Sequence, residues 1–452
     1  MTERRQGQLP LKPTHGGKLA VPDGGTVIVD SLADTPTNRP RVSQGYIWLL
    51  VLANFGAFMA VVAPGAISLS LRVQEIAPQN VEVLGYIVGA GAAIAALSQP
   101  LLGMWSDRTR SRLGRRRPFA IGGAVLGFIS LAFLAWAPSI PLLVIGWMLG
   151  MLGWTSAQLS LLLSQADRLP EEQRGKVAGL NGVFSMIAAV AGVAVASAFI
   201  GNNFQVFLVP GGIGLVLMLL WAIAVKEPSS RNIDFGPRLT VATVLSNMVF
   251  NPAKYPDFAW NWLGRLTYNF GVTFATTFTT LFFASRLSPT GQIADLGVLI
   301  PLISIASVVA TAGGAFLGGF LSDKLKRRRI FVLLSGVAFT AGAVTMCFGG
   351  SSLSVLVTGS VIANLGLGVF SAVDQAIVLD VLPEADTEAG RYMGINGYAT
   401  SVAQAIAPLI AIPLLVLNAN GAERNYGLLL LVAAACTLAG GMIITFKVRG
   451  AR

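Results

Sequence analysis

Nine long stretches of the chain contain no Asp, Glu, Lys or Arg, and this pattern limits the fold more than any other feature of the sequence. The stretches are residues 43–71, 83–106, 118–166, 177–225, 266–285, 296–322, 330–373, 392–422 and 425–446. A transmembrane helix needs about 20 predominantly apolar residues. The stretches 118–166, 177–225 and 330–373 are each long enough for two helices, and each has a turn signal near its middle. The pattern therefore predicts twelve transmembrane helices.

The composition excludes several classes of protein. Apolar residues make up 54% of the 452 residues and charged residues only 12%, against about 25% charged residues in soluble domains. Cys347 and Cys436 lie in apolar stretches, and the single histidine, His15, lies in a polar segment. We therefore expect no disulfide framework, no metal site and no His-based catalytic triad. The sequence has no Walker A motif, so we do not expect ATP to be the direct energy source. A membrane-embedded enzyme would need a cluster of acids or histidines within its helices, and only Asp374 qualifies clearly, so we predict that the protein is not an enzyme and needs no cofactor.

The distribution of Lys and Arg predicts the orientation of the helices. If the N-terminus is cytoplasmic, 28 of the 32 basic residues fall in cytoplasmic segments and three, Arg72, Arg286 and Arg424, fall outside. Such an excess on one side is typical of cytoplasmic loops. We expect a multi-pass protein of the plasma (inner) membrane with both termini in the cytoplasm. The basic loops face anionic lipid, so the net charge of +11 does not indicate a nucleic-acid partner.

Polar segments divide the chain into two groups of six predicted helices. We expect a disordered cytoplasmic tail at 1–44, a bundle at 45–225, a cytoplasmic linker at 226–258, a second bundle at 259–446 and a short cytoplasmic tail at 447–452. The tail at 1–44 is rich in Pro, Gly and Thr and has no apolar segment of the kind found in signal peptides.

The two groups of helices repeat short motifs at nearly one offset. The pairs are 103–107 with 319–323, 167–171 with 380–384, and 179–182 with 394–397, at offsets of 216, 213 and 215. Each pair falls at the same place in its own group of six helices. Since six is an even number, both groups start on the same side of the membrane. The sequence therefore predicts two parallel repeats related by an axis along the membrane normal.

The segment 106–119, which reads SDRTRSRLGRRRPF after Gly103, resembles the loop between the second and third helices of the major facilitator superfamily. In more detail it is similar to sucrose/proton symporters and glycoside–cation symporters. The resemblance implies an all-α membrane protein with twelve transmembrane helices in two parallel six-helix repeats. One departure concerns the fourth helix, where plant sucrose symporters carry an aspartate and residues 147–158 here have no acid.

The repeated motif supplies the residues that we expect to act in gating. They are Gly103, Asp107, Arg108, Arg115, Arg116, Gly319 and Asp323. Gly103 lets a neighbouring backbone approach closely, and Asp107 can accept charge-assisted hydrogen bonds from Arg108 or Arg115. The resemblance implies that this cluster bridges the two halves and closes the cytoplasmic side. The alternative is that the loop arginines only follow the positive-inside rule.

Polar residues inside the predicted helices are candidates for binding substrate and protons. By analogy with the superfamily, helices 1, 4, 7 and 10 line the central cavity, and each carries one amide. These amides are Asn54, Gln158, Asn269 and Asn364. They suit a hydroxyl-rich ligand, but helix–helix hydrogen bonding explains each of them equally well. Arg265 and Asp374 lie at similar predicted depths, and we expect them to form an ion pair tied to proton coupling. The alternative places Asp374 in the vestibule and Arg265 at the headgroups.

Two classes of function remain open. The first is a secondary transporter that works as a monomer and moves a small solute, most simply a sugar or glycoside, with a proton or other cation. Within this class, a proton antiporter that exports drugs or metabolites is the alternative, since the fourth and fifth helices are wholly apolar. The second class is a membrane receptor without transport activity, which should carry an added soluble domain.

Overall fold

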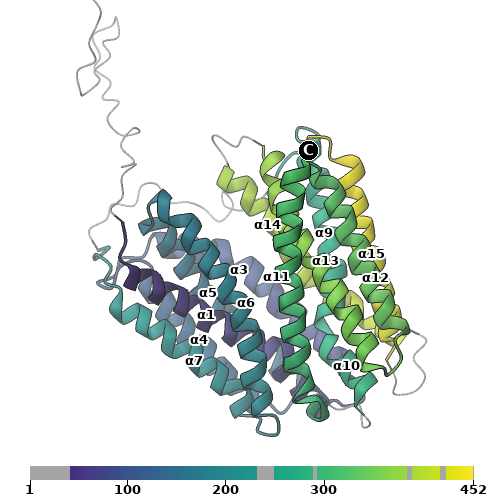
Figure 1. Ribbon diagram of the computed structural model, residues 1–452. Coiled ribbons are helices and arrows are strands. Elements are labelled where there is room, and N and C mark those ends of the chain that lie inside the picture. Colours follow the sequence, from purple (N-terminus) through teal and green to yellow (C-terminus); the bar gives the residue numbers. More distant parts are fainter. Residues whose placement is uncertain (1–40, 232–248, 289–292, 384–388, 418–423, 451–452) are drawn as a thin grey trace, which may run out of the picture.

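The computed structural model describes residues 41–231, 249–288, 293–383, 389–417 and 424–450. Almost all of the predicted disordered tail lies outside these ranges, as does much of the predicted linker. The described part is helical, and Figure 1 shows two bundles side by side, with the earlier helices in one and the later helices in the other.

The first bundle contains six long helical segments, and its first segment is not a plain α-helix. Pro64 and the four residues after it form a short π-helix within that segment, since a proline cannot donate the backbone hydrogen bond of a regular turn. The elements are α1 (Gln44–Ala63), η1 (Pro64–Ser68), α2 (Leu69–Ile76), η2 (Val81–Val83), α3 (Leu84–Asp107), α4 (Arg117–Trp136), α5 (Ile140–Arg168), α6 (Glu171–Ala198) and α7 (Gln205–Ala224).

The second bundle repeats this order, but its first span is broken. The helix that begins at Pro256 ends at Thr277, and Phe278 has a non-helical backbone before the next helix begins. The elements are α9 (Pro256–Thr277), α10 (Thr279–Leu287), η3 (Ile293–Leu296), α11 (Leu299–Leu325), α12 (Arg328–Phe348), α13 (Leu353–Asp380), α14 (Ala389–Val416) and α15 (Tyr426–Lys447).

The predicted spans agree with these elements, apart from the seventh. Among the described residues, eleven helical segments are long and apolar enough to cross a membrane. The seventh predicted helix corresponds to α9 and α10, and α9 carries Asp257, Asn261, Arg265 and Asn269, which lower its hydropathy. The all-α fold with membrane-spanning helices is confirmed, and the chain is a multi-pass membrane protein.

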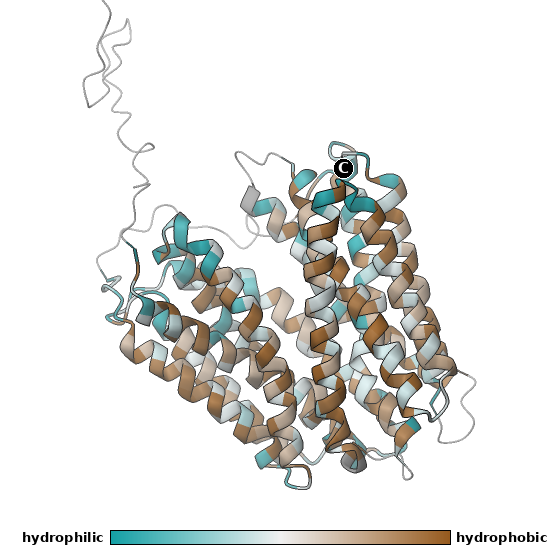
Figure 2. Ribbon diagram, viewed as in Figure 1, coloured by the Kyte–Doolittle hydropathy of each residue, from teal (hydrophilic) through white to brown (hydrophobic). Residues whose placement is uncertain are grey.

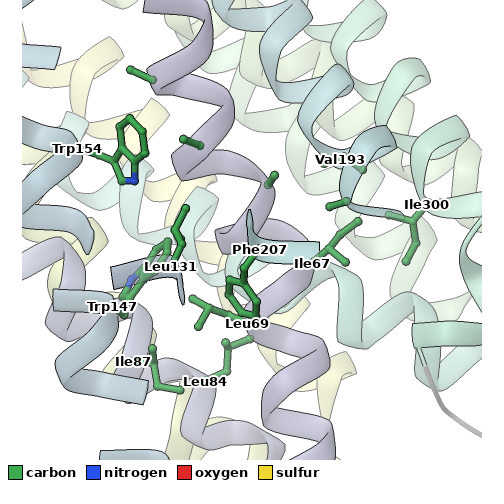
Figure 3. Close-up of a cluster of buried hydrophobic side chains, with 14 of the residues drawn as sticks. Ile67, Leu69, Leu84, Ile87, Leu131, Trp147, Trp154, Val193, Phe207 and Ile300 are labelled. Atoms are coloured by element: carbon green, nitrogen blue, oxygen red, sulfur yellow. The ribbon is translucent and has the colours of Figure 1, made fainter. Parts of the chain in front are cut away.

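Two buried tryptophans of α5 organise the core of the first bundle. Figure 3 shows Trp147 and Trp154 among the buried side chains of this bundle. Both rings lie against glycines, because a Cβ atom at Gly91 would stand 2.3 Å from the Trp147 ring and one at Gly127 would stand 2.7 Å from the Trp154 ring. The absence of side chains at these glycines lets the helices pack tightly around large aromatic groups.

Two faces of the molecule are distinguished by charge. One face, called here the basic face, carries the ends of α3 and α11 and the arginine-rich segments 115–117 and 327–329 that follow them. The other, called here the opposite face, carries Arg72, Arg286 and Arg424. The two bundles approach each other at the opposite face and diverge toward the basic face (Figure 1). Hydrophilic residues gather at the basic face, while the outer surface of long helices such as α11 is largely apolar (Figure 2).

Candidate functional site

A buried arginine of the first bundle joins two aspartates at the basic face. Arg116 precedes α4, and its side chain is only 4% exposed. Its guanidinium lies 2.6 Å from Asp107 at the end of α3 and donates to Asp167 of α5 at 2.9 Å. Arg115 contacts the other oxygen of Asp167 at 2.8 Å. Burial disfavours the charge on Arg116, but its hydrogen bonds to Asp167 and Asp107 raise its pKa overall, so the guanidinium stays charged.

The second bundle repeats this cluster in a more exposed form. Arg328 begins α12 and contacts Asp323 of α11 at 2.9 Å and Asp380 of α13 at 2.8 Å. Its side chain is 27% exposed, against 4% for Arg116. Among the described residues, the ion pairs of Arg116 and of Arg328 each stay within one bundle in this conformation.

Three residues of these sites were not predicted from the sequence. Asp167 and Asp380 complete the two clusters, although only Asp107 and Asp323 were expected to. Both missed acids lie in the second repeated motif, at offset 213. Glu227 was also missed. Its carboxylate accepts hydrogen bonds from the backbone N–H groups of Arg116 and Arg117 at 3.1 and 3.4 Å, and so caps the start of α4.

The two signature glycines do not play the expected packing role in this conformation. A Cβ atom at Gly103 would come no closer than 4.0 Å to Leu159, and one at Gly319 would lie 3.7 Å from Ala372. Both are ordinary van der Waals distances to side chains, so no backbone of the described residues approaches closely at either position. Arg108, the third expected gating residue of this loop, is half-buried at the end of α3.

The structure brings Arg265 and Asp374 together inside the second bundle. Arg265 of α9 donates through Nη1 to Oδ2 of Asp374 on α13, and through Nε to the hydroxyl of Thr400 on α14 at 3.4 Å. The side chain of Asp374 is 3% exposed and that of Arg265 is 18% exposed. The alternative with Asp374 in an open vestibule is therefore wrong for this conformation.

A cavity of about 280 Å³ lies deeper than this ion pair, toward the opposite face. Its polar groups come from the second bundle and its wall on the first bundle is apolar. The polar side chains that line it are Thr276, Thr279, Thr280, Ser304, Ser307, Ser360, Asn364 and Tyr426. The first bundle contributes Val62, Ala66, Ala189, Val190 and Val193. None of the described residues that line this cavity is charged.

Only one of the four predicted amides belongs to the described lining of this cavity. Asn364 lines it and accepts from Thr311 at 3.4 Å. Asn54 donates to Ser185 of α6 at 3.3 Å, and Asn269 donates to the backbone of its own helix at 2.8 Å. Gln158 is half-buried on α5 and is not a lining residue. For Asn54 and Asn269 the alternative of structural hydrogen bonding describes this conformation.

Polar contacts join the two bundles at the opposite face. Arg424, just before α15, contacts Glu82 of η2 at 2.7 Å, with both side chains nearly buried. Arg424 also donates to the backbone oxygen of Gln79. On α3, a Cβ atom at Gly85 would lie 2.3 Å from the carbonyl oxygen of Pro408 on α14. Helices of opposite bundles are therefore in backbone contact at this face.

Comparisons with known proteins agree with this architecture. The family model of the Major Facilitator Superfamily matches residues 46–408 and 293–450. A general alpha-glucoside permease of Schizosaccharomyces pombe is 47% identical over 55 residues, which make up 12% of this chain and 10% of the permease.

Two solved transporter structures share the fold. The nucleoside transporter NupG superposes with a TM-score of 0.71 at 11% identity and covers 89% of this chain and 100% of its own. A D-xylose-proton symporter has a TM-score of 0.65 at 15% identity and covers 89% of this chain and 97% of its own. At these identities the two structures establish the fold.

Proposed function

Because the chain belongs to the Major Facilitator Superfamily of membrane transporters, we propose that it moves a small uncharged solute, in the first place a sugar or glycoside, across the plasma membrane. The observation that carries this proposal is the chemistry of the cavity. Hydroxyl groups of α9, α10, α11 and α13 and the Asn364 amide offer hydrogen bonds. The aromatic rings of Phe274, Phe282 and Phe283 offer apolar contact. Such a mixture suits a ligand with hydroxyl groups and no charge.

The alternating-access cycle follows from the way the two bundles meet. We assign the basic face to the cytoplasm, on the strength of the excess of Lys and Arg there. The contacts of Glu82 with Arg424 then close the outer side, while the cavity opens toward the cytoplasm. In the opposite state the ends of α3 and α11 approach the other bundle. The gating residues of the two repeats, Asp107 and Asp323 among them, then exchange partners across the interface.

Proton coupling is assigned to Arg265 and Asp374. Asp374 lies ten residues from Asn364 on α13, which is about 15 Å along the helix axis, so protons and substrate bind at separate places. Protonation of Asp374 removes its charge and frees Arg265, and α9 and α13 can then shift. A monomer holds all of these groups, so no second subunit is needed.

Export of apolar compounds is the alternative function. The five residues that the first bundle contributes to the cavity are all Val or Ala, and such a wall binds apolar surface as readily as a sugar ring. The test must therefore include both import and export.

Transport by purified protein in proteoliposomes tests the proposal. We expect uptake of a labelled α-glucoside or nucleoside to rise when a proton gradient is imposed. Asn364→Leu should abolish counterflow of the same compound, because it removes an amide from the cavity. Gln158→Leu, on a helix outside the described lining, should leave counterflow unchanged. Transport of apolar dyes alone, with no sugar or nucleoside transported, would favour the exporter.

A further inference from the structure

The ion pair inside the second bundle leaves one carboxylate oxygen unused. Asp374 accepts from Arg265 through Oδ2. Its other oxygen, Oδ1, is buried and has no hydrogen-bond partner within the described part of the chain. A buried carboxylate oxygen without a donor is costly. A small ligand that donates hydrogen bonds is therefore expected beside Asp374.

Two asparagines lie on the side of Asp374 that faces the basic face. α9 and α14 both start at that face and run in parallel, as contacts of Phe258 with Tyr392 and of Arg265 with Thr400 show. Asn261 precedes Arg265 by four residues, and Asn396 precedes Thr400 by four residues. Residues four apart lie on the same side of a helix. Asn261 and Asn396 thus lie one helical turn closer to the basic face than the hydrogen-bonded pair of Arg265 and Thr400, on the sides of α9 and α14 that face each other.

Both asparagines are buried and incompletely bonded. Asn261 is fully buried and Asn396 is 2% exposed. Neither side-chain atom of Asn261 has a partner among the described residues, and the same is true of the Asn396 side-chain oxygen. Tyr268 lies one turn from Arg265 on the same helix and is fully buried. Its hydroxyl also has no hydrogen-bond partner among the described residues. Buried amides of this kind are normally satisfied by protein or by ordered water.

The atoms favour water over a cation. Three of them are acceptor oxygens, from Asn261, Asn396 and Asp374, and the Asn261 amide supplies a donor. A water molecule donates two hydrogen bonds and accepts two, and therefore matches this mixture. A sodium ion would also suit three oxygens, but it would lie close to the positive charge of Arg265.

We propose that Asn261, Asn396 and Oδ1 of Asp374 hold a small group of water molecules that passes protons between the basic face and Asp374. This inference rests on the proposed proton coupling. Asn261 lies five residues into α9, about 8 Å from its start, and Arg265 lies about 14 Å from it. The two amides therefore stand between the carboxylate and the solvent at that face. They are positioning residues, since they order the water that carries the proton.

The side chains around Asp374 include no second carboxyl group among the described residues, so the proposed water molecules are its route for protons. From α9, Arg265 and Tyr268 face it. α14 presents Thr400, which bonds to Arg265. Arg328 of α12 is held at the basic face by Asp323 and Asp380. Asp374 is thus the carboxyl group of this neighbourhood that takes up the proton.

Replacement of each asparagine by Val and by Thr, which have the same shape as each other, tests the relay. The full chain in lipid is subjected to a pH jump, and the carboxyl band that disappears in Asp374→Asn is followed by infrared spectroscopy. Asn261→Val and Asn396→Val should each slow the protonation of Asp374 at least tenfold. Asn261→Thr and Asn396→Thr have the same shape and keep a hydroxyl that can hold water, so they should stay within threefold of the original protein.

Each outcome of this experiment bears on the proposal. Equal rates in the Val and Thr variants would overturn the relay and leave the proton coupling intact. A dependence of the rate on sodium, with choline as the control ion, would replace water by a cation and would also overturn it. If no carboxyl band is lost in Asp374→Asn, Asp374 does not titrate, and the coupling and the relay are both wrong.

Discussion

At the scale of single residues, Asp167 is the acid on which the buried Arg116 depends most. Asp167 neutralises both Arg115 and Arg116, whereas Asp107 is 54% exposed and, among the ion pairs of the described residues, pairs with Arg116. Asp167→Asn should lower the free energy of unfolding by about 1–3 kcal/mol, since it leaves a buried guanidinium short of one charged partner. Thermal unfolding of the purified protein in detergent measures this loss.

Asp380→Asn is the matched control in the second bundle. Its partner, Arg328, is 27% exposed, so water can replace the lost carboxylate and the effect should be smaller. Equal losses of stability in the two variants would show that the burial of the arginine does not decide the result.

Some residues of these sites could be predicted from the sequence and others could not, for reasons that differ from residue to residue. Asp107 and the pair of Arg265 and Asp374 could be predicted, because a charge within or beside an apolar stretch stands out. Asp167 was visible only as part of a repeat. Asn261 and Asn396 carry no such signal, since a buried amide without a partner is recognised only when the neighbouring helices are in place.

At the scale of helices, the contact between α3 and α14 depends on a glycine. A Cβ atom at Gly85 would overlap the carbonyl oxygen of Pro408 at 2.3 Å, so Gly85→Ala should force the two helices apart. The contact at the opposite face should then weaken, and a cysteine at position 409 should react faster with a water-soluble maleimide. Gly122→Ala is the matched control, because a Cβ atom at Gly122 meets nothing within 4 Å. Equal labelling rates in the two variants would contradict this role of Gly85.

The positions of the helices could be predicted far better than their irregularities. The turn signals at 201–203 and 349–352 fall between helices in the structure, and the signal at 138–141 spans the boundary, since α5 begins at Ile140. Apolar length and charge suffice for such boundaries. The π-helix begins at Pro64, whose local effect is visible in the sequence, although its form is not. The break at Phe278 lies beside a contact with the other bundle, where Thr280 donates to the backbone of Ala66 at 2.7 Å. A contact across 214 residues leaves no local pattern in the sequence.

At the scale of the whole molecule, the proposed topology predicts which segments are accessible from each side. With Cys347 and Cys436 replaced by Ser, single cysteines at positions 20, 240 and 450 should react with an impermeant maleimide only after permeabilisation. A cysteine at position 351, in the exposed turn at the opposite face, should react in intact cells. Labelling of position 20, 240 or 450 from outside would reverse the assignment of the basic face to the cytoplasm.

The ion pair of Glu82 with Arg424 links the bundles at the face that is closed here. The two side chains are 11% and 10% exposed, and they belong to opposite bundles. Removal of one partner of a nearly buried pair costs about 2 kcal/mol or more, and each 1.4 kcal/mol changes a population ratio about tenfold. Loss of this pair should therefore shift the molecule measurably toward conformations that are open at the opposite face.

Charge exchange distinguishes this conformational effect from general damage. Glu82→Gln should lengthen the distance between spin labels at positions 204 and 351, one on each bundle, in the background without native cysteines. Combining Glu82→Arg with Arg424→Glu should restore the shorter distance, because the pair is rebuilt with its charges exchanged. Glu75→Gln is the control, since Glu75 pairs with Arg72 inside the first bundle. If Glu75→Gln lengthens the distance as much, or if the exchanged pair stays open, the Glu82–Arg424 contact does not hold the two bundles together.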